Sequence, residues 1–438
     1  MSKIKTPKLS LKLLLIFLAV LLTAQGCNFL GGGGRSRGPN IELTWWKPFD
    51  DSRLVRPLIE EFNKTFPNVR ITYVQKNVET YEDELVDAIA SGRGPDIFTI
   101  HNDWLPKHKE KLLPAPASSF SLREYQESFV EVAAADLLSD NQIYAVPLAV
   151  DVLSLYYNQD ILASAGIARP PATWEELVSL TAKLTRQDNF GDFQRSAIAL
   201  GTASNVNRAP DILGLLMLQN GTQFYTPALT QSLLDRAVPD ENNKSFVPAA
   251  RALEFYTQFA NPAKVSYTWN SRSNNSIEAF SSGKAAMIFS YSYLRPTLAA
   301  RAPFLNYAVA PAPQIDLLRS RVNYANYWAE GVSRQSPNAA AAWQFLQFIT
   351  QPEVLAKYYE VEKQPSSRID LLEQQIGDPE IGVFAEAALA AKSFYKPDSD
   401  AVEAIFVQMI ESVVLRNVSA EDAVQAASQK INLLLRNL

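Results

Sequence analysis

Short apolar runs alternate with amphipathic stretches in the part of the chain that follows residue 40. Residues 41–45 and 69–74 are rich in β-prone side chains, whereas 53–65 and 81–90 place apolar side chains at helical spacing. A third strand is expected over 95–100. The order strand, helix, strand, helix, strand predicts a parallel sheet with helices on its faces. Ligands of such sheets collect beyond the carboxyl ends of the strands.

The pattern becomes mostly helical after about residue 160. Strands are expected at 285–290 and 306–311, and residues 400–437 read as two amphipathic helices. An apolar extended run over 144–150 leads directly into Asp151. An unpaired acid is costly to bury, so a position at a strand crossover facing a cleft would explain this residue. A salt-bridged or solvated acid at a strand end is the alternative. The fold class predicted from these patterns is α/β.

The first forty residues have the pattern of an export signal. Residues 2–12 contain four lysines and no acid, residues 13–22 are all apolar, and the single cysteine of the chain, Cys27, follows shortly after. This order resembles the lipobox of bacterial lipoproteins, which are cleaved just before a cysteine that carries diacylglycerol. We therefore expect a signal peptide at 1–26, a lipidated Cys27 and a glycine-rich tether at 27–40. An ordinary cleaved signal or an uncleaved anchor remains an alternative.

Composition excludes several classes of protein. The 438 residues are 47% hydrophobic and 20% charged, which excludes a largely disordered chain. No apolar run reaches the roughly 20 residues of a membrane span, so a multi-span transporter is excluded. A formal net charge of −5 argues against a general nucleic-acid partner. One cysteine rules out a disulfide framework, and the only histidines, His101 and His108, read as surface or cleft residues. We expect no metal and no cofactor.

Five segments, in a fixed order, resemble one known family. The chain is similar to the extracytoplasmic solute-binding proteins of ABC importers, in the family that includes maltose-binding protein. The segments are GPDIF at 94–98, YAVP with LYYNQDIL at 144–162, TWEEL at 173–177, EAFSSGKAAM at 278–287 and SPN with AAWQFLQFIT at 336–350. Together they cover roughly residues 40–370, and the last sixty residues match only in helical character.

The resemblance implies a two-lobed fold of type II periplasmic binding proteins, with a ligand held between lobes that close about a hinge. We place crossovers near 149–152, 289–293 and 330–332. Lobe one would then be 41–150 plus 291–330, and lobe two 151–290 plus 331–438. Trp174 and Trp343 fall at positions that the family uses for packing.

A sugar has hydroxyl edges and apolar faces, so its site needs aromatic platforms beside polar side chains. Trp45 and Trp46 alternate along a strand, and we expect Trp46 to face the cleft and Trp45 the core. The candidate platforms, each following a strand or flanking a crossover, are Trp46, Trp104, Trp269, Tyr291, Tyr327 and Trp328. The candidate polar edges are Asp50 or Asp51, Asn102, Asp103, Asp151, Glu330 and Arg368. Of these, Asp151 matches the hinge acid of sugar-binding relatives.

The function that the resemblance implies is capture of a carbohydrate and its delivery to an ABC importer permease. The protein would be a monomer outside the cytoplasm, anchored to the bacterial membrane through Cys27. It would not be an enzyme, since no nucleophile elbow, P-loop or H-E-x-x-H motif occurs. Two alternatives stay open. The same fold could bind a polyamine, a phosphoester or a peptide, or the chain could be a binding or scaffold lipoprotein without a transport role.

Overall fold

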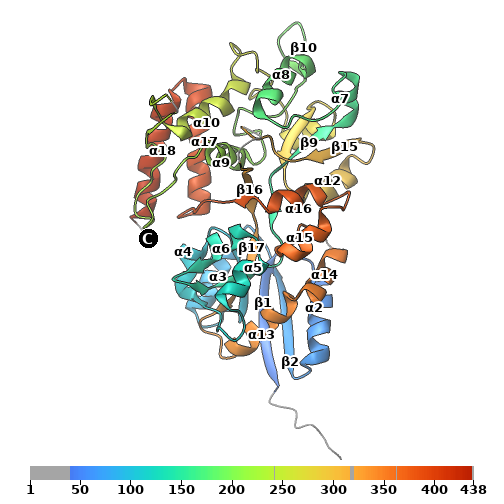
Figure 1. Ribbon diagram of the computed structural model, residues 1–438, viewed down its shortest axis with the longest axis vertical. Coiled ribbons are helices and arrows are strands. Elements are labelled where there is room, and N and C mark those ends of the chain that lie inside the picture. The colour runs from blue at the N-terminus through green and yellow to red at the C-terminus, as the bar shows by residue number, and fades with distance from the viewer. Residues whose placement is uncertain (1–39, 241, 316–319, 362, 437–438) are drawn as a thin grey trace, which may run out of the picture.

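Figure 1 shows the computed structural model of the chain, which describes residues 40–240, 242–315, 320–361 and 363–436. The expected signal peptide at 1–26, Cys27 and all but the last residue of the expected tether at 27–40 lie outside the described residues. Within the described ranges, no helix combines the length and the apolar character that crossing a membrane requires.

The lower lobe in Figure 1, lobe one, is built on a six-stranded sheet. Its strand order is β2-β1-β3-β17-β4, with β7 also pairing with β17. The strands are β1 (Ile41–Pro48), β2 (Val69–Lys76), β3 (Ile97–His101), β4 (Leu112–Leu113), β7 (Ala145–Pro147) and β17 (Trp328–Ser333). β1 runs parallel to β2 and β3, whereas β17 is antiparallel to its neighbours. The parallel arrangement expected for the first three strands is confirmed.

Helices cover this sheet because each buries one apolar face. In α2 (Ser52–Thr65), the Asp51 side chain caps the first turn and Val55, Leu58 and Phe62 are buried. The other helices of this lobe are α3 (Tyr81–Ala90), α4 (Leu105–His108), α5 (Leu122–Ser128), α6 (Glu131–Leu137), α13 (Ala339–Ile349), α14 (Pro352–Val361) and α15 (Ile369–Gln375). A 3₁₀ turn at Lys109–Lys111 and a small hairpin of β5 (Leu138–Ser139) and β6 (Gln142–Ile143) complete the lobe.

Lobe two centres on a three-stranded antiparallel sheet, in which β9 (Ser154–Asn158) lies between β14 (Met287–Ser290) and β15 (Tyr307–Ala310). Its helices are α7 (Gln159–Ser164), α8 (Trp174–Leu184), α9 (Ala209–Gln219), α10 (Pro248–Thr257), α11 (Ser276–Ser281), α12 (Leu294–Arg301), α16 (Gly382–Ala388), α17 (Ser399–Arg416) and α18 (Ala420–Leu435). A 3₁₀ turn at Gln258–Ala260 and two small hairpins, β10 (Arg186–Gln187) with β11 (Phe193–Arg195) and β12 (Val238–Pro239) with β13 (Ser245–Phe246), lie at its periphery. The two C-terminal helices agree with the sequence prediction.

A short sheet of β8 (Asp151–Val152), β16 (Asn323–Asn326) and β18 (Ala391–Lys392) lies where the two lobes meet (Figure 1). The chain passes from lobe one to lobe two between β7 and β9, in the region expected at 149–152. It returns between β16 and β17, which are separated only by Tyr327. This single residue is therefore a connection between the lobes.

The structure divides the second half of the chain differently from the expectation. β14 and β15 both pair with β9, so residues 291–326 stay with lobe two and not with lobe one. β17 instead pairs with β3, and α13 and α14 pack against α2, so 328–361 belongs to lobe one and not to lobe two. The expected crossover near 289–293 is therefore absent, and the return lies a few residues before 330. The physical reason is strand pairing between distant segments, which the local pattern does not specify.

Candidate functional site

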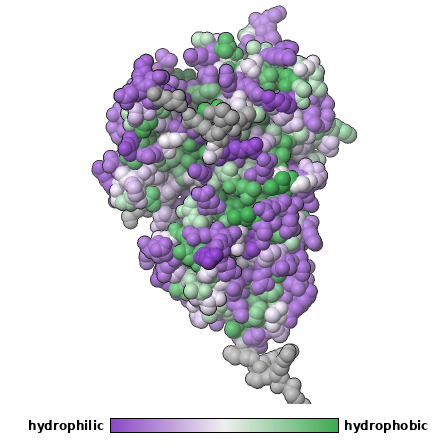
Figure 2. All heavy atoms as spheres, in the orientation of Figure 1, coloured by the Kyte–Doolittle hydropathy of each residue, from purple (hydrophilic) through white to green (hydrophobic). Residues whose placement is uncertain are grey.

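A cleft of about 1090 Å³ lies between the two lobes. Its lobe-one wall is formed by residues at the carboxyl ends of β1 and β3 and at the start of β17. Its lobe-two wall is formed by residues at the starts of α9 and α17. Apolar residues gather at mid-height of the molecule on the face shown in Figure 2. The cleft therefore opens at the edge of the parallel strands, where ligands are expected.

Aromatic rings form the lobe-one wall of the cleft. The ring centroid of Trp328 lies 5.2 Å from that of Trp104 and 5.6 Å from that of Phe49, both in edge-to-face geometry. Phe49 is 54% exposed although it is a large apolar residue. From lobe two, Tyr293 also lines the cleft and is 50% exposed. Exposed aromatic faces on both sides of a cleft suit a ligand that has apolar faces of its own.

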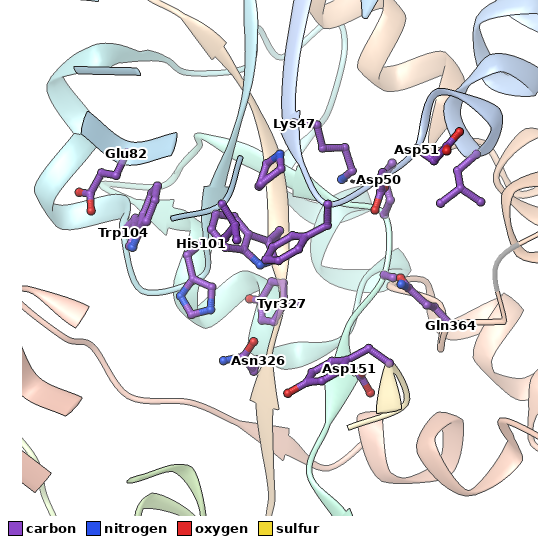
Figure 3. A pocket seen from close by; sticks show the side chains of 18 of the residues that line it. Lys47, Asp50, Asp51, Glu82, His101, Trp104, Asp151, Asn326, Tyr327 and Gln364 are labelled. Carbon is purple, nitrogen blue, oxygen red and sulfur yellow. Dashed lines mark ion pairs between the residues drawn. The ribbon is translucent and has the colours of Figure 1, made fainter. Parts of the chain in front are cut away.

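A buried ion pair supports this wall from beneath. Glu330 is fully buried and accepts hydrogen bonds from Trp45 Nε1 at 2.8 Å, Lys47 Nζ at 2.6 Å and Thr99 Oγ1 at 2.7 Å. Burial alone would lower the pKa of Lys47, but attraction to Asp50 and Glu330 outweighs it and raises that pKa. The Lys47 ammonium also lies 3.4 Å from the Asp50 carboxylate. A dashed line in Figure 3 marks this ion pair. The pair therefore ties β1 to β17 at the floor of the cleft.

Asp151 lies at the hinge and lines the cleft. Its carboxylate accepts hydrogen bonds from the backbone N–H of Val152 at 2.9 Å, from the backbone N–H of Ser292 at 3.0 Å and from Ser292 Oγ at 2.8 Å. Burial raises the pKa of Asp151 to about 6, and these hydrogen bonds oppose the shift. In Figure 3 the side chain lies near Asn326 and Gln364. Asp151 thus holds the segment that carries Tyr293.

Asp103 links the two lobes behind the cleft. Its carboxylate lies 2.6 Å from His101 Nδ1 in lobe one, accepts a hydrogen bond of 2.9 Å from Ser399 Oγ in lobe two and lies 3.6 Å from Lys396 Nζ. Burial would raise the pKa of Asp103, but attraction to His101 and Lys396 lowers it to about 2. Lys396 Nζ also lies 3.1 Å from Glu403. The contact joins the loop after β3 to the start of α17.

Comparison with known proteins identifies the family. The model of the bacterial extracellular solute-binding protein family matches residues 47–356. The chain belongs to this family.

A binding protein of Brucella abortus is 24% identical over 308 residues, which are 69% of this chain and 70% of that protein. The galactooligosaccharide-binding protein of Bacillus subtilis is 23% identical over 376 residues, 85% of this chain and 82% of that protein. The sugar-binding protein MalE of Xanthomonas citri has a similar structure, with a TM-score of 0.75, 19% identity and coverage of 90% of this chain and 98% of that chain. At this identity the structural likeness establishes the two-lobed fold.

Among the candidate residues, Asp50, Asp51, Trp104, Asp151 and Trp328 line the cleft of this solute-binding protein. Tyr327, also a candidate, lines it too, and its hydroxyl donates to Asp136 at 2.8 Å. His101 lines the cleft, whereas His108 is buried with Nε2 2.7 Å from Glu82. Among the described residues, no cluster of three or more His, Cys, Asp or Glu side chains is arranged to hold a metal ion.

Seven candidate residues lie outside the cleft lining: Trp46, Asn102, Asp103, Trp269, Tyr291, Glu330 and Arg368. Asn102 is buried, and its side-chain amide donates to Asp136 at 3.0 Å. The expectation that Trp46 faces the cleft is wrong. Trp45 points into the core toward Glu330, so Trp46 lies on the other face of β1, where the Lys76 ammonium lies 3.7 Å from the centre of its ring. Glu330 instead forms the buried ion pair with Lys47, and Asp103 forms the contact between the lobes.

The other three are occupied elsewhere. Trp269 is buried and donates through Nε1 to Asn205 at 3.1 Å, beside a smaller pocket of about 210 Å³ in lobe two. Arg368 pairs with Asp370 at 2.8 Å. Tyr291 is fully buried, and its hydroxyl donates a hydrogen bond of 2.7 Å to the Asp211 carboxylate. In each case the side chain is engaged by other protein groups and does not contribute to the cleft lining.

Sequence reasoning did not single out several residues that line the cleft: Lys47, Phe49, Arg208, Tyr293, Asn326, Tyr358, Gln364, Asp400 and Glu403. Phe49 could have been found, because it follows the end of the first strand directly. Arg208 and the residues of α17 could not, because they reach the cleft only through the packing of lobe two. Trp174 and Trp343 are buried, as the packing interpretation requires.

Proposed function

We propose that this solute-binding protein captures a carbohydrate in the cleft between its lobes and delivers it to an ABC importer permease. The observation that carries the proposal is the pair of exposed aromatic faces, Phe49 and Tyr293, on opposite walls of one cleft. Polar side chains surround them, including Asp50, Asn326 and Gln364. Rings suit the apolar faces of a sugar, and the polar groups suit its hydroxyl edges.

Relatives support a sugar as the ligand. The Bacillus subtilis relative is named as a galactooligosaccharide-binding protein, and the Xanthomonas citri protein of similar structure is described as sugar-binding. A ligand that contacts both walls binds the closed form better than an open form, and this difference in affinity drives closure. We propose that the cleft binds its ligand without chemical change, and that the protein acts as a monomer.

We further propose that the protein is a lipoprotein held outside the cytoplasm. The basic residues, the apolar run and Cys27 at the start of the chain support cleavage after residue 26 and diacylation of Cys27. Two acyl chains supply the membrane affinity that a single chain lacks. Metabolic labelling with a fatty acid tests this, because the wild type should incorporate label and Cys27→Ser should not. Label retained by Cys27→Ser would contradict the proposal.

Calorimetric titration tests the choice of solute. The chain from residue 27 onward, carrying Cys27→Ser, is titrated with maltotriose, mannobiose, a galactooligosaccharide, spermidine, glycerol 3-phosphate and a dipeptide. Heat with a sugar alone supports the proposal. Heat only with spermidine, the phosphoester or the dipeptide would assign another solute, and no heat at all would favour a role without transport.

A further inference from the structure

Arg208 precedes α9 in a backbone conformation that arginine rarely adopts. Its φ and ψ are 62° and 25°, in the left-handed region, and its side chain does not cap the helix. This conformation is unfavourable for a residue other than glycine, and it persists where the surrounding structure imposes it. Phe49, on the opposite wall of the cleft, has a φ of 66°. Each wall thus presents to the cleft one large side chain held by a strained backbone.

Two buried residues hold the guanidinium of Arg208 in place. Its Nε donates to Asp211 Oδ2 at 2.7 Å, and its Nη2 contacts the same oxygen. Asp211 is only 1% exposed, and Oδ2 also accepts a hydrogen bond of 2.7 Å from the hydroxyl of Tyr291. The guanidinium carbon lies 5.4 Å from the centre of the Tyr291 ring. The side chain is therefore fixed before any ligand arrives.

The fixed guanidinium still has donors for a ligand. An arginine has five N–H groups, and the contacts with Asp211 use only one edge of the fork. The side chain is 28% exposed and lines the cleft. Tyr293 lies beside it, with its ring stacked on Tyr291 at a centroid distance of 5.7 Å. A sugar ring resting on Tyr293 would place hydroxyl groups next to Arg208.

The charge around Arg208 sets which ligand it favours. Asp211 balances the positive charge, so the guanidinium offers hydrogen bonds without a net charge. Acids outnumber bases in the cleft lining and would repel an anion: Asp50, Asp51, Glu79, Glu82, Asp83, Asp151, Asp400 and Glu403 stand against Lys47, Arg53 and Arg208. An isolated arginine would attract phosphate, but this one is neutralised by a buried acid.

We propose that Arg208 is a specificity-determining residue, which together with Tyr293 selects an uncharged sugar over its phosphorylated form. The inference rests on the proposed function and names the ligand class of the same cleft. Asp211 and Tyr291 act as positioning residues, since they reach the ligand only through Arg208 and Tyr293. The inference predicts that loss of the guanidinium weakens sugar binding, and that loss of its counter-ion changes the preference for charge.

The first test compares Arg208→Gln and Arg208→Lys with the wild type, using whichever of maltotriose, mannobiose or a galactooligosaccharide binds the wild type. Kd should rise about 10- to 100-fold for Arg208→Gln, and Arg208→Lys should not restore it, because lysine lacks the planar fork. Arg169→Gln is the matched control, since Arg169 forms a two-point ion pair with Glu176 on the surface of lobe two, outside the cleft lining. Thermal unfolding of each variant separates loss of binding from loss of folding.

The second test uses Asp211→Asn, which keeps the shape of the side chain but removes its charge. This variant should bind glucose 6-phosphate better, relative to glucose, than the wild type does. An unchanged sugar Kd in folded Arg208→Gln, or an unchanged charge preference in folded Asp211→Asn, would overturn the inference alone. If the wild type bound no sugar, the proposed function would fail as well, so the two failures are distinguishable.

Discussion

Replacing Glu330 would test the argument that a buried ion pair supports the cleft. The Glu330 carboxylate is fully buried and accepts three hydrogen bonds, from Trp45, Lys47 and Thr99. In Glu330→Gln the side chain keeps its size but loses its charge. Lys47 is 6% exposed, and among the residues that the structure describes its ammonium would then keep Asp50, at 3.4 Å, as its ionic partner.

The size of the effect follows from these contacts. Removing one partner of a buried ion pair costs about 3–5 kcal/mol when the remaining charge is left unpaired, and the lower end of that range applies here because Lys47 keeps the Asp50 carboxylate at 3.4 Å. Each neutral hydrogen bond that the amide fails to replace adds about 1 kcal/mol. With two such neutral bonds, from Trp45 and Thr99, we therefore expect Glu330→Gln to lower the free energy of unfolding by about 3–5 kcal/mol. Lys47→Met with Glu330→Gln should recover at least about 2 kcal/mol of the summed single losses, since neither charge remains.

Urea unfolding at pH 7, followed by far-ultraviolet circular dichroism, measures these changes. Arg123→Gln is the control, because Arg123 and Glu127 form an ion pair of similar length, 2.7 Å, on an exposed helix face. This control should unfold at the midpoint of the wild type. Wild-type stability of Glu330→Gln, or strictly additive losses in the double variant, would refute the argument that a charged pair supports the cleft.

Three further outcomes are expected. Burial in the folded protein raises the pKa of Asp151 from an ordinary value of 3.8 to about 6. Protonation of Asp151 therefore contributes its full stabilisation below about pH 4, and this contribution is lost as the pH rises through 6. Urea unfolding measured between pH 4 and 7 should therefore show the free energy of unfolding falling more steeply with rising pH in the wild type than in Asp151→Asn. Parallel pH profiles of the two proteins would contradict this expectation. Phe49→Ala should weaken binding of a sugar ligand about tenfold by titration calorimetry, whereas Phe190→Ala, at an 88% exposed residue outside the cleft, should not. Gly201→Ala should lower the free energy of unfolding by about 2 kcal/mol or more, since φ is 109° and a Cβ would lie 2.6 Å from a backbone nitrogen. Gly377→Ala is the control and should not lower it, because nothing lies within 4 Å of a Cβ there. Equal stabilities of the two variants in urea would disprove the steric argument.

The local pattern predicted the first strands and helices, but it missed β16 and β17 and did not specify how strands pair. The alternation at 41–45 and 69–74 and the helical spacing at 53–65 predicted β1, α2 and β2, because burial of one face depends on nearby residues. The pairing of β15 with β9 and of β17 with β3 joins residues far apart in sequence. No local signal specifies those pairings, so the lobe boundaries in the second half of the chain were misplaced.

The site shows the same division. Trp104 follows a strand that the sequence predicts, and Trp328 lies beside the crossover that the family resemblance places near 330–332. The direction of Trp46 was not visible, because alternation says only that Trp45 and Trp46 point to opposite faces. The place of Arg208 in the cleft was not predicted. Its side chain is held by Asp211 and by the ring of Tyr291, and the contact with Tyr291 joins residues far apart in sequence.

The edge-to-face contact between Trp104 and Trp328 gives the cleft its own optical signal. Indole emission depends on the polarity and the motion of what surrounds the ring, and both rings border the space that a ligand would fill. Filling that space would displace water from two of the seven tryptophans while the buried Trp45, Trp174, Trp269 and Trp343 keep their surroundings. Occupancy could then be read from the unlabelled protein, with Trp104→Phe and Trp328→Phe assigning the signal to one ring or the other.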